Sequence, residues 1–375
     1  MLTQPFAEAI QQAEKIITSA PHVLGDQDLV EGYDYLAGSI RASIQMAGAY
    51  ERDFPYFVRS TGPYTKMGLD NPDTLYFHAW LRDDTEYVVT GVRGTTADLS
   101  FQLLDGDYSP VEVPGSLAAF DDREIDIAAD GTFEITLGPA RNAAMLVVRE
   151  VYHDWAAERP GMLRIHRADR LGSAPPPLTL DRMTKRYGVA GKILISRLRT
   201  FLAFAERFYL GLPVNTLTPP RPTPGGLSTQ YSSAGHYDLD DDQAMIVTVP
   251  ASDAPYQGIQ LGSMWYVSLD YINHQTSLTR AQARTDPDGM IRYVVSERNP
   301  GVTNWLERTG HRRGYVQLRW QRLSRPLAAA DGPKVDIVAV DDLPKQLPYY
   351  EPISAEAYRE RIAARQAATA YRMLG

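Results

Sequence analysis

The chain has 375 residues, which is too long for one ordinary hydrophobic core and suits two domains. Its net charge of −8, with no Lys/Arg-rich stretch, argues against nucleic acid or a membrane as a partner. The absence of cysteine excludes disulfides, thiolate nucleophiles and zinc–cysteine or iron–sulfur sites. The N-terminus does not resemble a signal peptide, so we expect a cytoplasmic protein.

Helical patterns come first along the chain and strand patterns follow. Apolar periodicity predicts helices over 3–18 and 28–49, and an aromatic loop punctuated by prolines runs from 52 to 73. Short runs rich in Val, Ile, Thr and aromatic residues then alternate with turn residues, which predicts antiparallel strands. These runs cover 87–92, 100–104, 133–137 and 145–149.

A second series of strands follows a long helix. The helix is predicted over 181–210 from its broad apolar face, and a linker rich in proline and glycine follows it. A last helix is expected over 354–374, with Ser354 as its N-cap. We expect these two helices either to cover the β-domains or to build a homodimer. The second strand series covers 244–249, 259–261, 290–295 and 315–320.

The two strand series repeat at a single offset. His236 lies 158 positions after His78, and Asp288 lies 158 positions after Asp130. The same shift aligns an Asp-Asp turn, a Val-Thr pair and a Gln-Leu pair. Because one register explains all of these matches, they indicate an internal duplication.

We therefore predict a mainly β chain with flanking helices, built from two tandem antiparallel β-sandwich or jelly-roll-like domains. The boundaries are 1–73 for the N-terminal helices and aromatic loop, 74–170 for the first repeat, 171–227 for the helical and Pro-rich linker, 228–325 for the second repeat and 326–375 for the C-terminal extension with its helix.

The second copy carries two segments that the first lacks, an aromatic run over 264–277 and an insertion over 298–314. Loops added to a duplicated scaffold often carry function. We predict His274 as a catalytic acid or base, because histidine titrates near neutral pH; alternatively it is satisfied by backbone at a strand end. The predicted substrate contacts from these segments are Trp265, Tyr271, Gln275, Asn304 and Trp305.

A polar and aromatic group opens the first copy. Asn71 and Asp73 belong to an Asn-Pro-Asp turn, and Tyr76 and His78 follow on the predicted strand. One interpretation is a turn that feeds a strand. The other places all four residues on one wall of a cleft, with Asp73 and His78 catalytic and Asn71 and Tyr76 in contact with substrate.

A metal site and an anion site were weighed as well. His236 and Asp238 form a His-X-Asp tripeptide, which in non-haem iron oxygenases binds iron together with a distant histidine. Because His78 has no carboxylate after it, we predict that His236 contacts substrate and that no metal or other cofactor is used. Arg149 and Arg319 suit a carboxylate or phosphate, but a structural salt bridge is the preferred interpretation.

Four sequence motifs resemble the bacterial domain-of-unknown-function family 1214, which occurs with family 1254. They are Asn71–Tyr76, Gly235–Tyr237, Ser268–Leu278 and Asn299–Leu306, and the resemblance covers most of the chain from Asn71 to Trp320. The chain departs from the pattern at Thr303, where proline is expected, and its first half lacks much of the 1254 pattern. The resemblance implies β-sandwich or jelly-roll domains and no settled activity.

The predicted function is an enzyme that acts on a small, fairly apolar molecule. A cleft between the two β-domains would hold the substrate, and metal-independent acid–base chemistry of a hydrolase or lyase type would follow. A non-catalytic protein that binds a sugar or a lipid-like ligand is one alternative, and the iron oxygenase is the other. Motifs of serine hydrolases, nucleotide-binding enzymes and zinc proteases are absent.

Overall fold

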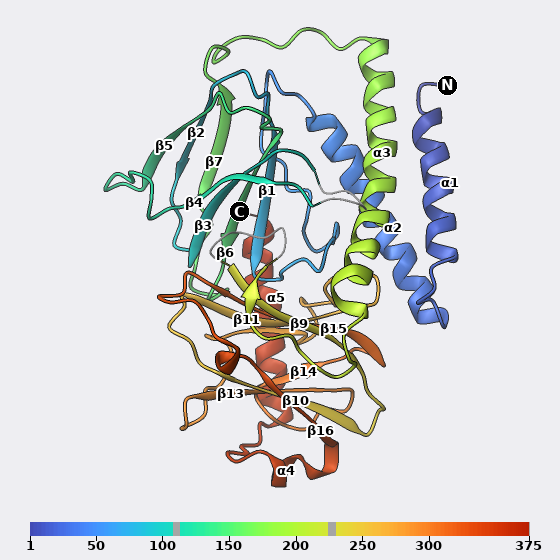
Figure 1. The fold of residues 1–375 in the computed structure, drawn as a ribbon, viewed down its shortest axis with the longest axis vertical. Coiled ribbons are helices and arrows are strands. Elements are labelled where there is room, and N and C mark those ends of the chain that lie inside the picture. The colour runs from blue at the N-terminus through green and yellow to red at the C-terminus, as the bar shows by residue number, and fades with distance from the viewer. Residues whose placement is uncertain (108–112, 224–229, 375) are drawn as a thin grey trace.

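Two β-sandwich domains stack along the long axis of the molecule, and a layer of helices lies against one side (Figure 1). The computed structural model describes residues 1–107, 113–223 and 230–374. The mainly β fold with flanking helices is as predicted. Within the described part of the chain, no helix is both long and apolar enough to cross a membrane.

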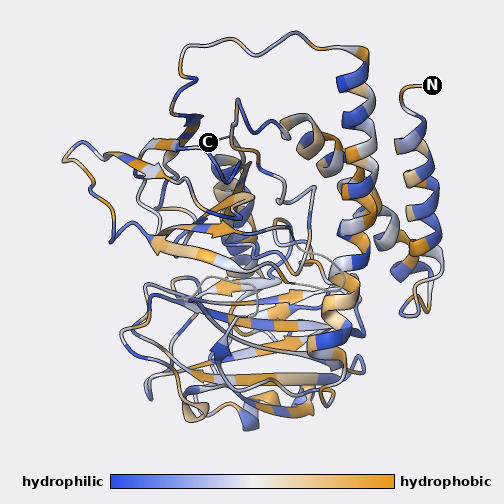
Figure 2. Ribbon diagram, turned by 45° about the horizontal axis from the view of Figure 1, so that its top comes forward, coloured by the Kyte–Doolittle hydropathy of each residue, from blue (hydrophilic) through white to orange (hydrophobic). Residues whose placement is uncertain are grey.

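The helical layer consists of α1 (Gln4–Thr18), α2 (Asp26–Ala49) and α3 (Leu180–Ala205), which share one hydrophobic core. In Figure 2, hydrophobic and hydrophilic residues are mixed along these helices, as expected when only one face of a helix is buried. The predicted helix over 181–210 is divided, because its last five residues form a π-helix, η1 (Glu206–Leu210).

The first domain contains two antiparallel sheets that pack face to face. One has the strand order β1 (Thr74–Trp80), β6 (Met145–Val151), β3 (Asp98–Leu104) and β4 (Ser116–Asp121). The other has the order β5 (Thr132–Leu137), β2 (Tyr87–Val92) and β7 (Met162–Arg167).

The second domain contains a larger pair of sheets. One has the order β12 (Ser277–Thr279), β11 (Tyr256–Gly262), β15 (Arg313–Gln321), β9 (Gln230–Asp238) and β8 (Arg221–Pro222). The other has the order β14 (Trp305–Glu307), β13 (Met290–Ser296), β10 (Gln243–Pro250) and β16 (Lys334–Ala339). Residues 334–339, which were expected in the C-terminal extension, therefore form a strand of the second domain.

The two domains share one strand order. The series β1-β6-β3-β4 corresponds to β9-β15-β11-β12, and β5-β2-β7 corresponds to β13-β10-β16. His78 pairs with Val147 on the neighbouring strand, and His236 pairs with Tyr315. This agreement fits the repeat in the sequence, while the duplication itself stays a prediction.

Each sandwich is filled by its own hydrophobic core. Leu146 and Val148 lie in the core of the first domain, and Leu261 and Leu318 lie in that of the second. All four are at most 1% exposed. Chemistry is therefore expected between the domains rather than inside either sandwich.

The C-terminal segment returns from the second domain to the first. It contains η2 (Ala329–Asp331), β16, η3 (Val340–Asp342), α4 (Leu343–Gln346) and α5 (Ala355–Leu374). The hydroxyl of Ser354 accepts a hydrogen bond from the backbone N–H of Ala357, which confirms the predicted N-cap.

Helix α5 holds the two domains together. The Arg365 guanidinium donates to the carbonyl oxygen of Tyr271 in the second domain, at 3.0 and 3.1 Å. Arg372 donates to the carbonyl oxygen of Pro72 at the start of the first domain, at 2.5 Å. These buried contacts make α5 part of the domain junction.

Candidate functional site

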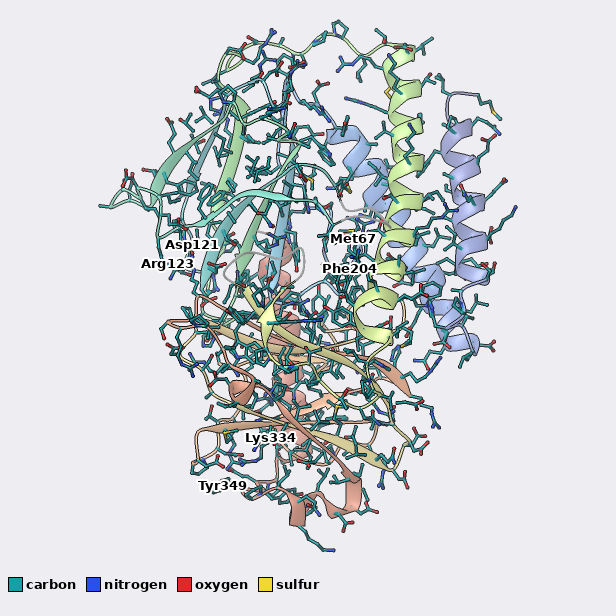
Figure 3. The ribbon with its side chains drawn as sticks, in the orientation of Figure 1. Met67, Asp121, Arg123, Phe204, Lys334 and Tyr349 are labelled. Carbon is teal, nitrogen blue, oxygen red and sulfur yellow. The ribbon has the colours of Figure 1, made fainter. Side chains whose placement is uncertain are left out.

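A pocket of about 140 Å³ lies where the two domains meet the end of α3. One face of the sheet β1-β6-β3-β4 forms one wall, and the face of β15 forms the opposite wall. The loop over 61–71, the end of α3 and η1 close one side. In Figure 3, Met67 and Phe204 lie together between the lower end of α3 and the two domains.

Strand alternation brings the polar side chains to this pocket. Side chains two positions apart on a strand share a face, so Tyr76 and His78 of β1 project together. Tyr76 is paired in register with Arg149 of β6. On the opposite wall, Arg319 and its alternate neighbours on β15 face the same space.

Two arginines line the pocket without a carboxylate partner. Arg149 donates from Nη1 to Oε1 of Gln102 at 2.8 Å. Arg319, only 7% exposed, donates to Oε1 of Gln260 and, at 2.6 Å, to the carbonyl oxygen of Leu69. Neither forms a salt bridge with an Asp or Glu among the described residues. Arg319 is buried and Arg149 is half-buried. Because charges removed from water are ordinarily paired, the two arginines mark the pocket as a place for an anion.

His78 adds a neutral imidazole to the same wall. Its Nδ1 is 2.8 Å from Oγ of Ser60, and its Nε2 has no hydrogen-bond partner among the described residues. Burial, helped by the nearby charges of Arg149 and Arg197, lowers the pKa of His78 to about 3. The imidazole is therefore neutral at physiological pH.

Hydrogen bonds of the Asn-Pro-Asp turn hold the neighbouring residues of the pocket in place. Asn71 Oδ1 accepts the backbone N–H of Asp73 at 3.0 Å, as expected of an Asx turn. The backbone N–H of Asn71 donates to the hydroxyl of Tyr76 at 3.0 Å, and its side-chain amide donates to the hydroxyl of Tyr256 at 2.9 Å. The hydroxyl of Tyr76 thus keeps its own proton for a ligand.

Asp70 also lines the pocket, and its carboxylate lies near the charges of both Lys66 and Arg319. Both of its oxygens accept from Ser268, one from the backbone N–H at 3.1 Å and one from the hydroxyl at 2.9 Å. Burial raises the pKa of Asp70, while the nearby charge of Lys66 opposes that rise. Lys66 itself donates to the carbonyl oxygens of Ser268 and Leu269, at 2.7 and 2.9 Å.

Aromatic rings form the remaining wall. The rings of Phe204 and Tyr266 are 5.9 Å apart, and those of Tyr209 and Tyr266 are 5.8 Å apart. Gly68, at a φ of +66°, lets the loop touch the helix, because a Cβ there would lie 2.6 Å from the Phe201 ring. The pocket is thus basic on two walls and apolar on a third.

The structure places the second copy's predicted residues away from this pocket. The side chain of His274 is 40% exposed, and its Nδ1 lies 2.9 Å from Glu307. Gln275 donates to the backbone of Thr303 at 3.0 Å and to the backbone of Trp305. Asn304 donates to the backbone of Arg284 at 2.8 Å and of Arg292 at 3.2 Å, and Trp305 donates to that of Ser296 at 3.1 Å. The inserted loop therefore packs against its own domain.

The remaining predicted residues join parts of the molecule. Asp73 accepts from Nε1 of Trp155 and the hydroxyl of Tyr256, at 2.7 and 2.8 Å. Trp265 donates to the backbone of α2 at 2.7 Å, and Tyr271 packs beside Trp155. Of the predicted residues, only Asn71, Tyr76 and His78 line the interdomain pocket.

The proposed iron ligands have other partners. Nε2 of His236 lies 2.9 Å from the carbonyl oxygen of Leu212, and Asp238 forms a salt bridge with Arg312 at 2.8 Å. Within the described ranges, no three His, Cys, Asp or Glu side chains are close enough to share a metal ion.

Two other hollows lack an uncompensated buried charge. One, of about 950 Å³, is an open groove along β5-β2-β7 near Gly91, and its charged residues Asp126, Glu134 and Arg164 are exposed. The other, of about 220 Å³, lies between α2 and residues 263–270. There the charge of Lys66 faces several carboxylates, so no counter-ion is required.

Comparison with known proteins supports the fold and assigns no activity. No family model matches the chain, and no curated protein matches it. An uncharacterized protein from Burkholderia cenocepacia is similar in structure over 90% of this chain and 96% of its own, with a TM-score of 0.80 and 27% identity. A protein from Vibrio parahaemolyticus aligns over 82% of this chain and 97% of its own, with a TM-score of 0.42 and 14% identity. Only the similarity to the Burkholderia cenocepacia protein is strong enough to support a conclusion, and it supports the overall fold alone.

Proposed function

We propose that the chain binds a small organic anion in the pocket between its two domains. The observation that carries this proposal is the pair of arginines, Arg149 and Arg319, that line one pocket without a carboxylate partner among the described residues. Removing a guanidinium from water costs free energy that a charge-assisted hydrogen bond offsets. A bound carboxylate would supply that bond.

The pocket also suits an apolar portion of the ligand. Phe204, Tyr209 and Met67 line the third side, between the two polar walls. The volume of about 140 Å³ is close to the roughly 150 Å³ of a cavity that admits benzene. The ligand is therefore a short molecule with an acidic end and a few apolar carbons.

The first prediction tests the anion site directly. Replacing Arg149 with Gln removes one charge and keeps a hydrogen-bonding group, so affinity for short carboxylic acids should fall at least about tenfold. Isothermal titration calorimetry on the full chain gives the dissociation constants. Arg164→Gln is the matched control, because Arg164 is an exposed arginine on β7 of the same domain. Equal affinities of wild type and Arg149→Gln would reject the site.

A catalytic role for the same pocket is the second candidate. The neutral imidazole of His78, with Nε2 unbonded, suits donation of a hydrogen bond to a developing oxyanion in the tautomer that carries its proton on Nε2. NMR spectra of short carboxylic acids incubated with the protein should then show products. Those products should be absent with His78→Gln. If the acids stayed unchanged after long incubation with the wild-type protein, the catalytic role would be rejected and only the binding role would remain.

We also propose that the chain belongs with the family 1214 proteins that its motifs resemble. The Asn71–Tyr76 motif borders the interdomain pocket, whereas Asn299–Leu306 packs within the second domain. The family name carries no activity, so the proposed ligand depends on the pocket alone.

A further inference from the structure

We infer that the natural ligand is a short dicarboxylate, with one carboxylate on Arg149 and the other on Arg319. This inference rests on the proposed function and adds the number and placement of the ligand's charges.

Two arginines and one aspartate are the charged residues that line the pocket, and each arginine can accept a carboxylate of its own. Lys66 and Asp70 offset each other electrostatically, and His78 is neutral. Asp70 also lies near the charge of Arg319, but neither Arg149 nor Arg319 forms a salt bridge with a carboxylate among the described residues that line the pocket. A monoanion bound to Arg149 would leave the buried guanidinium of Arg319 without a carboxylate, which is costly.

The two arginines are anchored separately, on opposite walls. Arg149 of β6 is held by Gln102 of the adjacent strand β3. Arg319 of β15 is held by Gln260 of the adjacent strand β11. Each guanidinium is thus fixed on its own sheet, and each domain contributes one. Two anionic groups joined by a short chain fit this arrangement better than one compact anion.

The space between the walls sets the length of that chain. A volume of about 140 Å³ holds roughly as many heavy atoms as a small aromatic ring with a few substituents. A dicarboxylate with a backbone of about four or five carbons meets this limit. Its methylene groups would face Phe204 and Met67, and the hydroxyl of Tyr76 would donate a hydrogen bond to one carboxylate.

The test compares ligands that differ in one charged group. Calorimetric titrations of the full wild-type chain would use succinate, glutarate, butyrate, pentanoate and inorganic phosphate. The dicarboxylates should bind about 10- to 100-fold more tightly than the monocarboxylates of equal length, the usual contribution of one charged hydrogen-bonded pair. In the Arg149→Gln variant, succinate should lose this advantage and bind no more tightly than butyrate binds to the same variant, because only one arginine of the pair remains.

The outcomes separate this inference from the proposed function. Equal affinity for succinate and butyrate would overturn the dicarboxylate and leave the anion site standing. Tighter binding of phosphate than of any dicarboxylate would also overturn it, in favour of one compact dianion. No binding of any anion would reject both. The wild-type comparison decides the matter even if Arg319→Gln, a buried substitution, fails to fold.

Discussion

At the pocket wall, Arg319 uses two of its hydrogen-bond donors, one on Gln260 and one on Leu69. A guanidinium has five N–H groups, so most of its donors have no acceptor among the described residues. Sequence reasoning noticed Arg149 and Arg319 but favoured a salt bridge, because a strand pattern does not show what faces it. A stronger signal was present on β15, where Gln317, Arg319 and Gln321 alternate with apolar residues in a strand that is almost entirely buried.

His78 gives a prediction for stability against pH. Its pKa is about 3 in the folded chain and near 6.5 in the unfolded chain. Between these values the unfolded state binds more protons, so the free energy of unfolding falls as pH drops below about 6.5 and continues to fall toward pH 3. The contribution should be about 2 kcal/mol smaller at pH 5 than at pH 7.

Urea denaturation at several pH values measures this loss. His78→Gln has no titrating group, so its free energy of unfolding should vary less across the same window. A wild-type curve as flat as that of His78→Gln between pH 7 and pH 4.5 would show that His78 is not held neutral by burial.

At the scale of elements, local pattern predicted the major helices and about half of the strands of the described residues, because periodicity and turn residues act over a few positions. The strand over 87–92 is as predicted. The short strands β12 and β14 escaped prediction, since their three residues carry no period of their own. The aromatic wall escaped as well, because the loop and α3 meet only in the folded chain.

The contact between that loop and α3 yields a second stability prediction. Gly68→Ala combines a positive φ with a Cβ against the Phe201 ring, so it should lower the free energy of unfolding by about 1–3 kcal/mol. Gly48→Ala is the control, because Gly48 lies in α2 with no atom near the added Cβ. Chemical denaturation of both variants measures the difference, and equal stabilities would contradict the close approach.

At the scale of the whole molecule, the pocket, α5 and Asp73 all lie at the junction of the two domains. Sequence reasoning placed the site between the β-domains, yet it located only one wall, because side chains from opposite sheets carry no common motif. Figure 1 shows α5 passing from the second domain toward the first. The sequence alone does not reveal that α5, some 280 positions after Asp73, brings the charges of Arg365 and Arg372 close to its carboxylate.

Asp73 provides the prediction at this scale. Each of its carboxylate oxygens accepts a hydrogen bond, one from Trp155 of the first domain and one from Tyr256 of the second. Asn offers only one acceptor, so Asp73→Asn should cost about 1–3 kcal/mol of unfolding free energy. Asp83→Asn, in an exposed turn, should cost little. If Asp73→Asn kept full stability but lost an activity, the catalytic role predicted from sequence would be favoured instead.

The self-contained cores of the two sandwiches have a consequence for how such a protein changes over time. The residues that line the interdomain pocket lie outside the two sandwich cores, so exchanging one of them changes recognition and the stability of the junction but removes nothing from either core. Residues of the interdomain pocket can therefore be substituted one at a time. Proteins with this architecture can differ in the ligands that they bind.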